Sequence, residues 1–268
     1  MVGSVDLGDF TMQYASFGHG DKTMVMIPGL SLKPVSPLAL MIEKAYEVFT
    51  KDYTVYLLDR RDNAPADYTA EEMVEDTYMA LKELGVESAY FLGASQGGAI
   101  TMELAIMHPD MVKGMAIGSS AAYVNEMGAS VLETWLDLSN KRESLSLAEH
   151  MIDVIYSKNT LSANRDSLIK AFSNLNEEEL VQFINLCEGF RSYDIRDRLG
   201  EIKCPTIVIG CEGDKVFGAD ASREIYEGIS AGNVKCELYI YGNSYGHAVY
   251  DEAPDYKERV YNFFENLR

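Results

Sequence analysis

The chain has 268 residues, a formal net charge of -19 at pH 7, and a length that suits one large α/β domain carrying an insertion. The negative charge argues against nucleic acid or an anionic membrane as a partner, because it repels phosphate groups. The sequence begins without a basic region and apolar run, and no uncharged apolar stretch approaches the ~20 residues needed to span a bilayer. These features predict a soluble, cytoplasmic protein.

The first half of the chain alternates short runs of β-forming residues with amphipathic segments, which is typical of βα units around a parallel sheet. Helix starts are expected at Ser36, a potential N-cap before Pro37, and at Thr69, which can form a capping box with Glu72. Five strands are predicted in this half, at residues 10–17, 23–27, 54–58, 89–92 and 112–117.

The pattern changes between residues 123 and 193, where β-forming runs vanish and amphipathic helical stretches follow one another. Strand signals return in "CPTIVIGC" and "CELYIY", and "DYKERVYNFFENLR" at residues 255–268 predicts a final helix with one apolar face. We therefore expect a core domain made of residues 1–122 and 194–268, with residues 123–193 as a helical cap insertion.

Two stretches match the G-x-S-x-G pattern of a serine nucleophile. One is centred on Ser95 in "FLGASQGGA", and the other on Ser244 in "YGNSYGH", where His247 follows at once. The chemistry requires a strand, a tight turn and a helix, so that the serine projects at the carboxyl end of a sheet. The context of each serine must therefore decide between them.

Ser95 has the required context. The strand-like "AYFL" precedes it, Gly93 and Gly97 leave room where backbones crowd, and a buried helix face continues beyond it. After Ser244 no uninterrupted helix begins, and Pro254 follows soon, so this stretch is expected to be a loop. We predict Ser95 as the nucleophile.

Over essentially its whole length the chain resembles the α/β-hydrolase family, in particular its small capped esterases. The resemblance is carried by the order "MIPGL", "LLDRR", "GASQGG", "MHPDMV", "CPTIVIGCEGD", "GH" and "EAP". It implies a mostly parallel eight-stranded sheet flanked by helices, with a helical cap. It also implies an acid after "TIVIG" and a base after "ELYIY", positions held here by Asp214 and His247. Glu212 and Asp220 follow the same strand and are alternative acids.

The resemblance further implies an oxyanion hole built from two backbone N–H groups. Gln96, directly after the nucleophile, and Leu30, in the loop after the third strand, hold the matching positions. Pro28-Gly29 stands where many relatives have His-Gly, and the loop "DRRDNAP" lacks the glycine that is usual there.

These residues predict a serine hydrolase that cleaves a small ester through an acyl-enzyme, most simply a carboxylesterase. Thioesterase, lactonase and carbon-carbon bond hydrolase activities are alternatives, as is a small-molecule receptor on the same fold. Neither a metal nor an organic cofactor is expected, because this acyl-enzyme chemistry needs none. The four cysteines also form no C-x-x-C pair or zinc pattern. The sequence does not indicate the oligomeric state. Five residues of the predicted cap could line an acyl pocket or pack within the cap: Tyr123, Trp135, Met151, Phe172 and Phe183.

Overall fold

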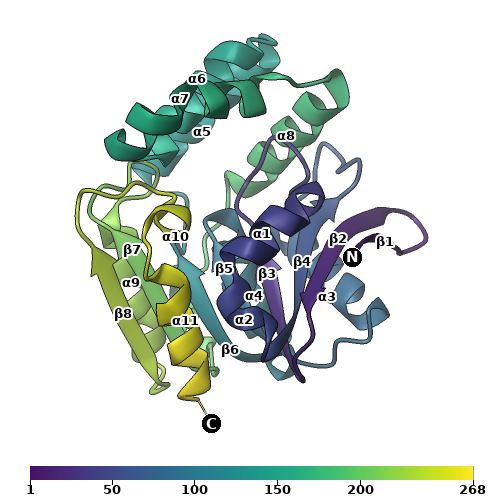
Figure 1. Ribbon diagram of the computed structural model, residues 1–268, viewed down its shortest axis with the longest axis vertical. Coiled ribbons are helices and arrows are strands. Elements are labelled where there is room, and N and C mark those ends of the chain that lie inside the picture. Colours follow the sequence, from purple (N-terminus) through teal and green to yellow (C-terminus); the bar gives the residue numbers. More distant parts are fainter. Residues whose placement is uncertain (268) are drawn as a thin grey trace.

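A single eight-stranded sheet forms the centre of the computed structural model, which describes residues 1–267 (Figure 1). Its strand order is β1-β2-β4-β3-β5-β6-β7-β8. The pairs β1-β2 and β2-β4 are antiparallel, and the other five pairs are parallel. The strands are β1 (Val2–Asp6), β2 (Thr11–Gly18), β3 (Lys22–Ile27), β4 (Tyr53–Arg61), β5 (Ala89–Ala94), β6 (Val112–Gly118), β7 (Thr206–Cys211) and β8 (Cys236–Tyr241).

Helices cover both faces of this sheet (Figure 1). One face carries α1 (Ala39–Ala45), α2 (Glu47–Thr50) and α11 (Tyr256–Glu265), and the other carries α3 (Ala70–Glu83), α4 (Gln96–Met107) and α9 (Ala219–Ser230). The buried apolar side chains accordingly form two clusters, one for each face. Shorter helices occur at connections: η1 (Ser36–Leu38), η2 (Pro109–Met111), η3 (Arg196–Glu201) and α10 (Val249–Glu252).

Between β6 and η3 the chain forms four further helices: α5 (Glu126–Asn140), α6 (Ser144–Ile155), α7 (Lys158–Ser173) and α8 (Glu177–Phe190). In Figure 1, α5, α6 and α7 lie together at one end of the molecule, and α8 descends from them toward the sheet. All four fall within residues 123–193, the predicted insertion, and its treatment as a separate cap stays a prediction.

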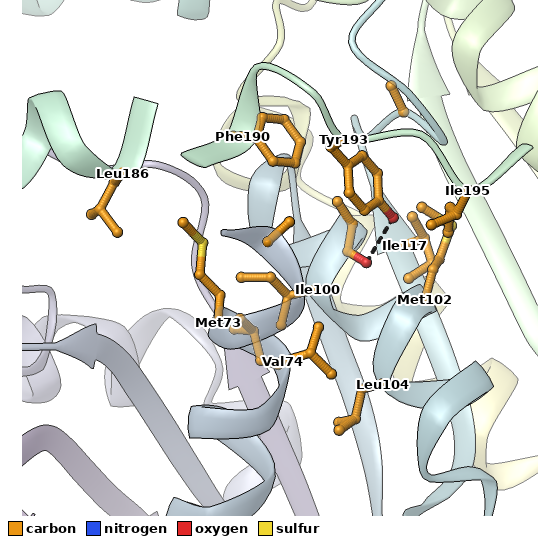
Figure 2. Packing of buried hydrophobic residues seen from close by; sticks show 14 of the residues in the cluster. Met73, Val74, Ile100, Met102, Leu104, Ile117, Leu186, Phe190, Tyr193 and Ile195 are labelled. Carbon is orange, nitrogen blue, oxygen red and sulfur yellow. Dashed lines mark hydrogen bonds between the residues drawn. The ribbon is translucent and has the colours of Figure 1, made fainter. Parts of the chain in front are cut away.

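The helix α8 is joined to the core through packing and hydrogen bonds. Leu186 and Phe190 share one hydrophobic cluster with Met73 of α3 and Ile100 of α4 (Figure 2). Just after α8, the Tyr193 hydroxyl donates a 3.0 Å hydrogen bond to the Ala99 carbonyl, drawn dashed in Figure 2. The end of α8 and the segment after it thus pack against α3 and α4.

The seven strands located from the sequence are all present. The strand β1 was not located, and α7 was not located individually among the helical stretches predicted for residues 123–193. The strand β1 contains Gly3 and Ser4 at the sheet edge and buries only Val5, so it lacks alternation. The helix α7 has no buried residue, so it has little apolar periodicity to detect. The predicted last helix ends at Glu265, and Arg268 lies outside the described residues.

The two predicted helix starts differ in outcome. Thr69 and Glu72 form the expected capping box at α3, which confirms that prediction. The prediction of Ser36 as an N-cap was wrong, because Ser36 is the first residue of η1 and its side chain caps nothing. The Asp59 carboxylate at the end of β4 instead accepts the N–H groups of Val35 and Ser36, at 2.6 and 2.9 Å. A carboxylate from another element therefore replaces the local cap.

No helix in residues 1–267 has the length and apolar character needed to cross a membrane.

Candidate active site

Ser95 occupies a strained turn between β5 and α4. Its backbone lies at φ 52° and ψ -124°, a conformation that an L-residue adopts only when its surroundings enforce it. Its N–H donates to the Gly118 carbonyl at 2.8 Å, and its carbonyl accepts the Ser120 hydroxyl at 2.7 Å. These hydrogen bonds to residues at the end of β6 stabilise the strained backbone of Ser95, as expected for a nucleophile elbow.

The glycines of this elbow are required by close contacts. A Cβ atom on Gly97 would lie 2.0 Å from the Ile27 carbonyl oxygen, and one on Gly93 would lie 2.4 Å from Oγ1 of Thr101. A Cβ on Gly29 would approach Cβ of Ser95 to 3.1 Å. The loop after β3 therefore passes directly against the serine, which is where the second oxyanion donor is expected.

His247 and Asp214 form a buried pair. Nδ1 of His247 lies 3.0 Å from each carboxylate oxygen of Asp214, and the two side chains are only 3% and 2% exposed. Asp214 follows β7 and His247 follows β8, so both lie at the carboxyl edge of the sheet, as Ser95 does after β5. With Nδ1 donating to the carboxylate, the lone pair of Nε2 is free to accept a proton.

The surroundings of Asp214 keep its carboxylate ionised. Burial raises the pKa of Asp214, but the His247 charge and hydrogen bonds from His247, Val216 and Phe217 outweigh it, and the pKa lies below its ordinary value. The N–H groups of Val216 and Phe217 reach Oδ1 at 2.7 and 3.2 Å. Asp214 is therefore a fixed anion that can orient the imidazole.

The loop that carries His247 is bound to the α6–α7 junction. The Ala248 N–H donates to the Ile155 carbonyl at 2.9 Å. The Glu252 carboxylate accepts the N–H of Gly246 at 2.6 Å and that of Ser157 at 2.8 Å. The helical insertion thus fixes the backbone on which the histidine stands.

The alternative acids lie elsewhere. Glu212 and Asp220 both bind the Arg223 guanidinium, and the Asp220 side chain is 97% exposed. Ser244 is also exposed, in a turn after β8. Of the carboxylates that follow β7 in the sequence, the structure therefore pairs only Asp214 with the histidine.

Gln96 and Leu30 are placed consistently with oxyanion donors, and that role stays a prediction. Gln96 is the first residue of α4, where the N–H groups of a helix lack intrahelical acceptors. Leu30 follows Gly29, the residue that faces Ser95. The departure of "DRRDNAP" from a glycine-containing turn is accommodated by Asn63, which adopts φ 55°.

Sequence reasoning missed the side-chain network of Arg60 and Gln96. Nη2 of Arg60 donates to the Pro28 carbonyl at 2.8 Å and to Oε1 of Gln96 at 3.3 Å. Nε2 of Gln96 in turn donates to the Leu186 carbonyl of α8 at 3.2 Å. The only signal in the sequence was the charged run Asp59-Arg60-Arg61 at the end of a largely apolar strand.

The five residues considered for an acyl pocket have mostly packing roles. Trp135, Met151 and Phe183 are buried in the larger hydrophobic cluster, and Phe172 packs partly buried against it. The Tyr123 ring lies under the Arg196 guanidinium, 3.8 Å from its centre. Within residues 1–267, no group of three His, Cys, Asp or Glu side chains is arranged to hold a metal ion.

A mostly parallel sheet of eight strands, with a strained serine at the end of β5 and an acid–histidine pair after β7 and β8, is the architecture of the α/β hydrolases. The family profile described as "alpha/beta hydrolase fold" matches residues 22–254. The chain belongs to the α/β-hydrolase fold family.

Individual relatives are distant. The chain is 23% identical to "Putative carbamate hydrolase RutD" of Stutzerimonas stutzeri over 76% of this chain and 79% of that protein. It is 26% identical to 3-oxoadipate enol-lactonase 1 of Acinetobacter baylyi over 61% and 62% of the two chains. Among solved structures, MGS-M2, an α/β hydrolase from a Medee basin deep-sea metagenome library, superimposes with a TM-score of 0.86 at 22% identity, covering 98% of this chain and 97% of its own. The relatives support a hydrolase in general terms.

Proposed function

We propose that this protein is a serine hydrolase, most simply a carboxylesterase, acting on a small ester with Ser95 as nucleophile, His247 as base and Asp214 as the orienting acid. The observation that carries this proposal is that a strained Ser95 backbone and a buried His247–Asp214 pair occur at the same edge of the sheet. Energy stored in such a backbone is typical of functional sites.

In the proposed reaction, Oγ of Ser95 attacks the acyl carbon while Nε2 of His247 takes the hydroxyl proton. The oxyanion accepts hydrogen bonds from the N–H groups of Leu30 and Gln96. It collapses, and the alcohol leaves with the proton from His247. A water molecule, deprotonated by His247, then attacks the acyl-enzyme, and the acid is released with Ser95 restored.

A lactone substrate is the second candidate, because one distant relative carries the name enol-lactonase and a lactone is an internal ester. Thioester and carbon-carbon bond cleavage would use the same three residues. A small-molecule receptor would use the same fold to bind its ligand without hydrolysing it. Cytoplasmic localisation stays a prediction from the sequence.

The test is labelling with a fluorophosphonate probe, together with hydrolysis of p-nitrophenyl acetate, butyrate and octanoate. We expect labelling of one serine and measurable turnover that declines as the pH is lowered through the range in which histidine side chains become protonated. A folded protein that neither binds the probe covalently nor hydrolyses any ester would favour the receptor function instead.

A further inference from the structure

Arg60 is a buried cation whose hydrogen-bond acceptors are neutral. The residue is 9% exposed, and Nη2 donates to the Pro28 carbonyl and the Gln96 side-chain oxygen. Its Nε is buried without a hydrogen-bond partner. In the part of the chain that the structure describes, no carboxylate oxygen lies within 4.0 Å of its nitrogen atoms.

Such an arrangement is costly in the free protein. A buried charge normally has a partner of opposite sign, because removing it from water costs several kcal/mol. Burial lowers the pKa of Arg60 to about 10, and the nearby Asp59 carboxylate offsets only part of that effect. The Asp59 carboxylate is already occupied by the N–H groups of Val35 and Ser36. The guanidinium therefore still lacks an anion in contact with it.

Arg60 lines a cleft of about 550 Å³ whose walls also include Ser31 of the loop after β3 and Leu186 of α8. The loop that meets Ser95 at Gly29 continues into the wall of this cleft at Ser31. Leu186 of α8 also lines the cleft, and its carbonyl accepts the hydrogen bond from Gln96, the residue after the serine. A ligand in the cleft would thus lie between the predicted oxyanion loop and the insertion.

The acidic residues of the cleft do not pair with Arg60. One, Glu178, is exposed. The other four already accept hydrogen bonds: Asp59 from Val35 and Ser36, Asp62 from Thr11 and Gln13, Glu177 from Arg142, and Glu179 from Asn176. None of these five carboxylates therefore neutralises the Arg60 guanidinium by direct contact.

We propose that Arg60 forms a carboxylate-binding subsite, so that the preferred substrates are esters or lactones whose acyl part carries a second, ionised carboxyl group. Both hydrogens of Nη2 are engaged by Pro28 and Gln96, so a carboxylate would accept hydrogen bonds from Nη1, and such charge-assisted bonds are strongest in a desolvated site. This inference rests on the proposed hydrolase function.

The test compares esters that differ only in one charge. p-Nitrophenyl monoesters of C5 to C7 dicarboxylic acids are each paired with the methyl-capped, neutral diester of the same chain length. We expect the wild type to favour the anionic ester in kcat/KM, and Arg60→Gln to lower the anionic-to-neutral ratio about 10- to 100-fold. Arg60→Lys should retain part of the ratio, because it keeps the positive charge and loses the planar guanidinium that also binds Pro28 and Gln96. An unchanged ratio in Arg60→Gln, with both esters slowed alike, would show that Arg60 only positions the Pro28 loop.

Lys33→Gln is the matched control, since Lys33 is a half-exposed cation in the same cleft. We expect it to change the ratio less than about threefold, because exposed charges are screened. An effect as large as that of Arg60→Gln would point to the general field of the cleft and overturn a specific subsite.

A binding measurement separates this inference from the proposed function. Calorimetric titration of Ser95→Ala with monomethyl pimelate needs no turnover, and adding Arg60→Gln should weaken that binding about tenfold or more. Equal affinity in the single and double variants would overturn the subsite even if the enzyme proves to be an esterase. Conversely, a wild type that hydrolyses no ester but binds the monoester through Arg60 would refute the hydrolase proposal alone.

Discussion

The stretches around Ser95 and Ser244 have the same five-residue pattern and entirely different structures. At Ser95 the chain leaves β5, adopts a positive φ and enters α4 at once, and both flanking glycines are pressed against neighbouring atoms. At Ser244 the chain leaves β8 into an exposed turn, and a Cβ on Gly242 would meet nothing within 4 Å. The first glycine of the pattern is therefore required by close contacts at Ser95 and not at Ser244.

The second stretch is nevertheless part of the site, because it delivers His247. Its last glycine, Gly246, is buried against the α6–α7 junction: a Cβ there would lie 2.6 Å from the Ile155 carbonyl oxygen. The first stretch therefore presents Ser95 on a strained turn between β5 and α4. The second presents His247 on a loop that is bound to the α6–α7 junction.

The largest expected effect separates the two serines. Ser95→Ala should remove fluorophosphonate labelling and lower kcat by about 10³- to 10⁶-fold, since only binding and oxyanion contacts would remain. Ser244→Ala should keep labelling and lose less than about tenfold. Mass spectrometry of labelled peptides decides the matter: a phosphonate on the Ser244 peptide alone would reverse the assignment.

The acid gives the next largest difference. Asp214→Asn should lower kcat by about 10³- to 10⁴-fold, because an amide at this position favours the wrong imidazole tautomer. Asp220→Asn and Glu212→Gln are the controls and should change kcat little, as both residues bind Arg223 instead. Steady-state kinetics on one ester measures all three, and a crippled Asp220→Asn beside an active Asp214→Asn would contradict the geometry.

The glycines can be compared through stability. Gly97→Ala would force its Cβ to 2.0 Å from the Ile27 carbonyl oxygen, and we expect a loss of about 3 kcal/mol in the free energy of unfolding. Gly242→Ala, with open space around the added methyl group, should change it by less than about 1 kcal/mol. Urea denaturation measures both, and similar values for the two variants would refute the distinction between the motifs.

Contact between the insertion and the second stretch can be weakened at Glu252. Glu252→Gln retains one acceptor oxygen for the two N–H groups of Gly246 and Ser157, so one buried donor loses its partner. We expect about 1–3 kcal/mol lower stability and up to tenfold lower kcat through displacement of His247. Glu258→Gln, at an exposed residue of α11, is the control in the same assays. If Glu252→Gln had the same stability and kcat as this control, the contacts of Glu252 with Gly246 and Ser157 would be unimportant.

Much of this organisation could be predicted from the sequence. Apolar runs and the Thr69 capping box located the strands and α3. The G-x-S-x-G pattern in its strand–helix context indicated Ser95, and the resemblance to α/β hydrolases implied Asp214 and His247. Arg60 could not be found in this way, because its acceptor Pro28 is 32 residues away in the chain. The link that Glu252 makes to the α6–α7 junction could not be found either, because Ser157 is 95 residues away. A side chain that acts on a distant backbone group leaves no local periodicity.

The smallest expected effect is the pH dependence of stability contributed by Asp214. Its pKa is lower in the folded protein than in an unfolded chain, so its ionisation contributes stability above the unfolded pKa, and this contribution is lost as the pH falls through the folded value. Wild type should therefore exceed Asp214→Asn in stability at pH 7, and the difference should shrink as the pH is lowered below about 4. Asp220→Asn, at a carboxylate that is 97% exposed, should show no such convergence. Urea denaturation of the three proteins between pH 7 and 3 measures this, and a difference that grows toward acid pH would mean that burial, rather than the His247 pair and the two N–H groups, controls the carboxylate.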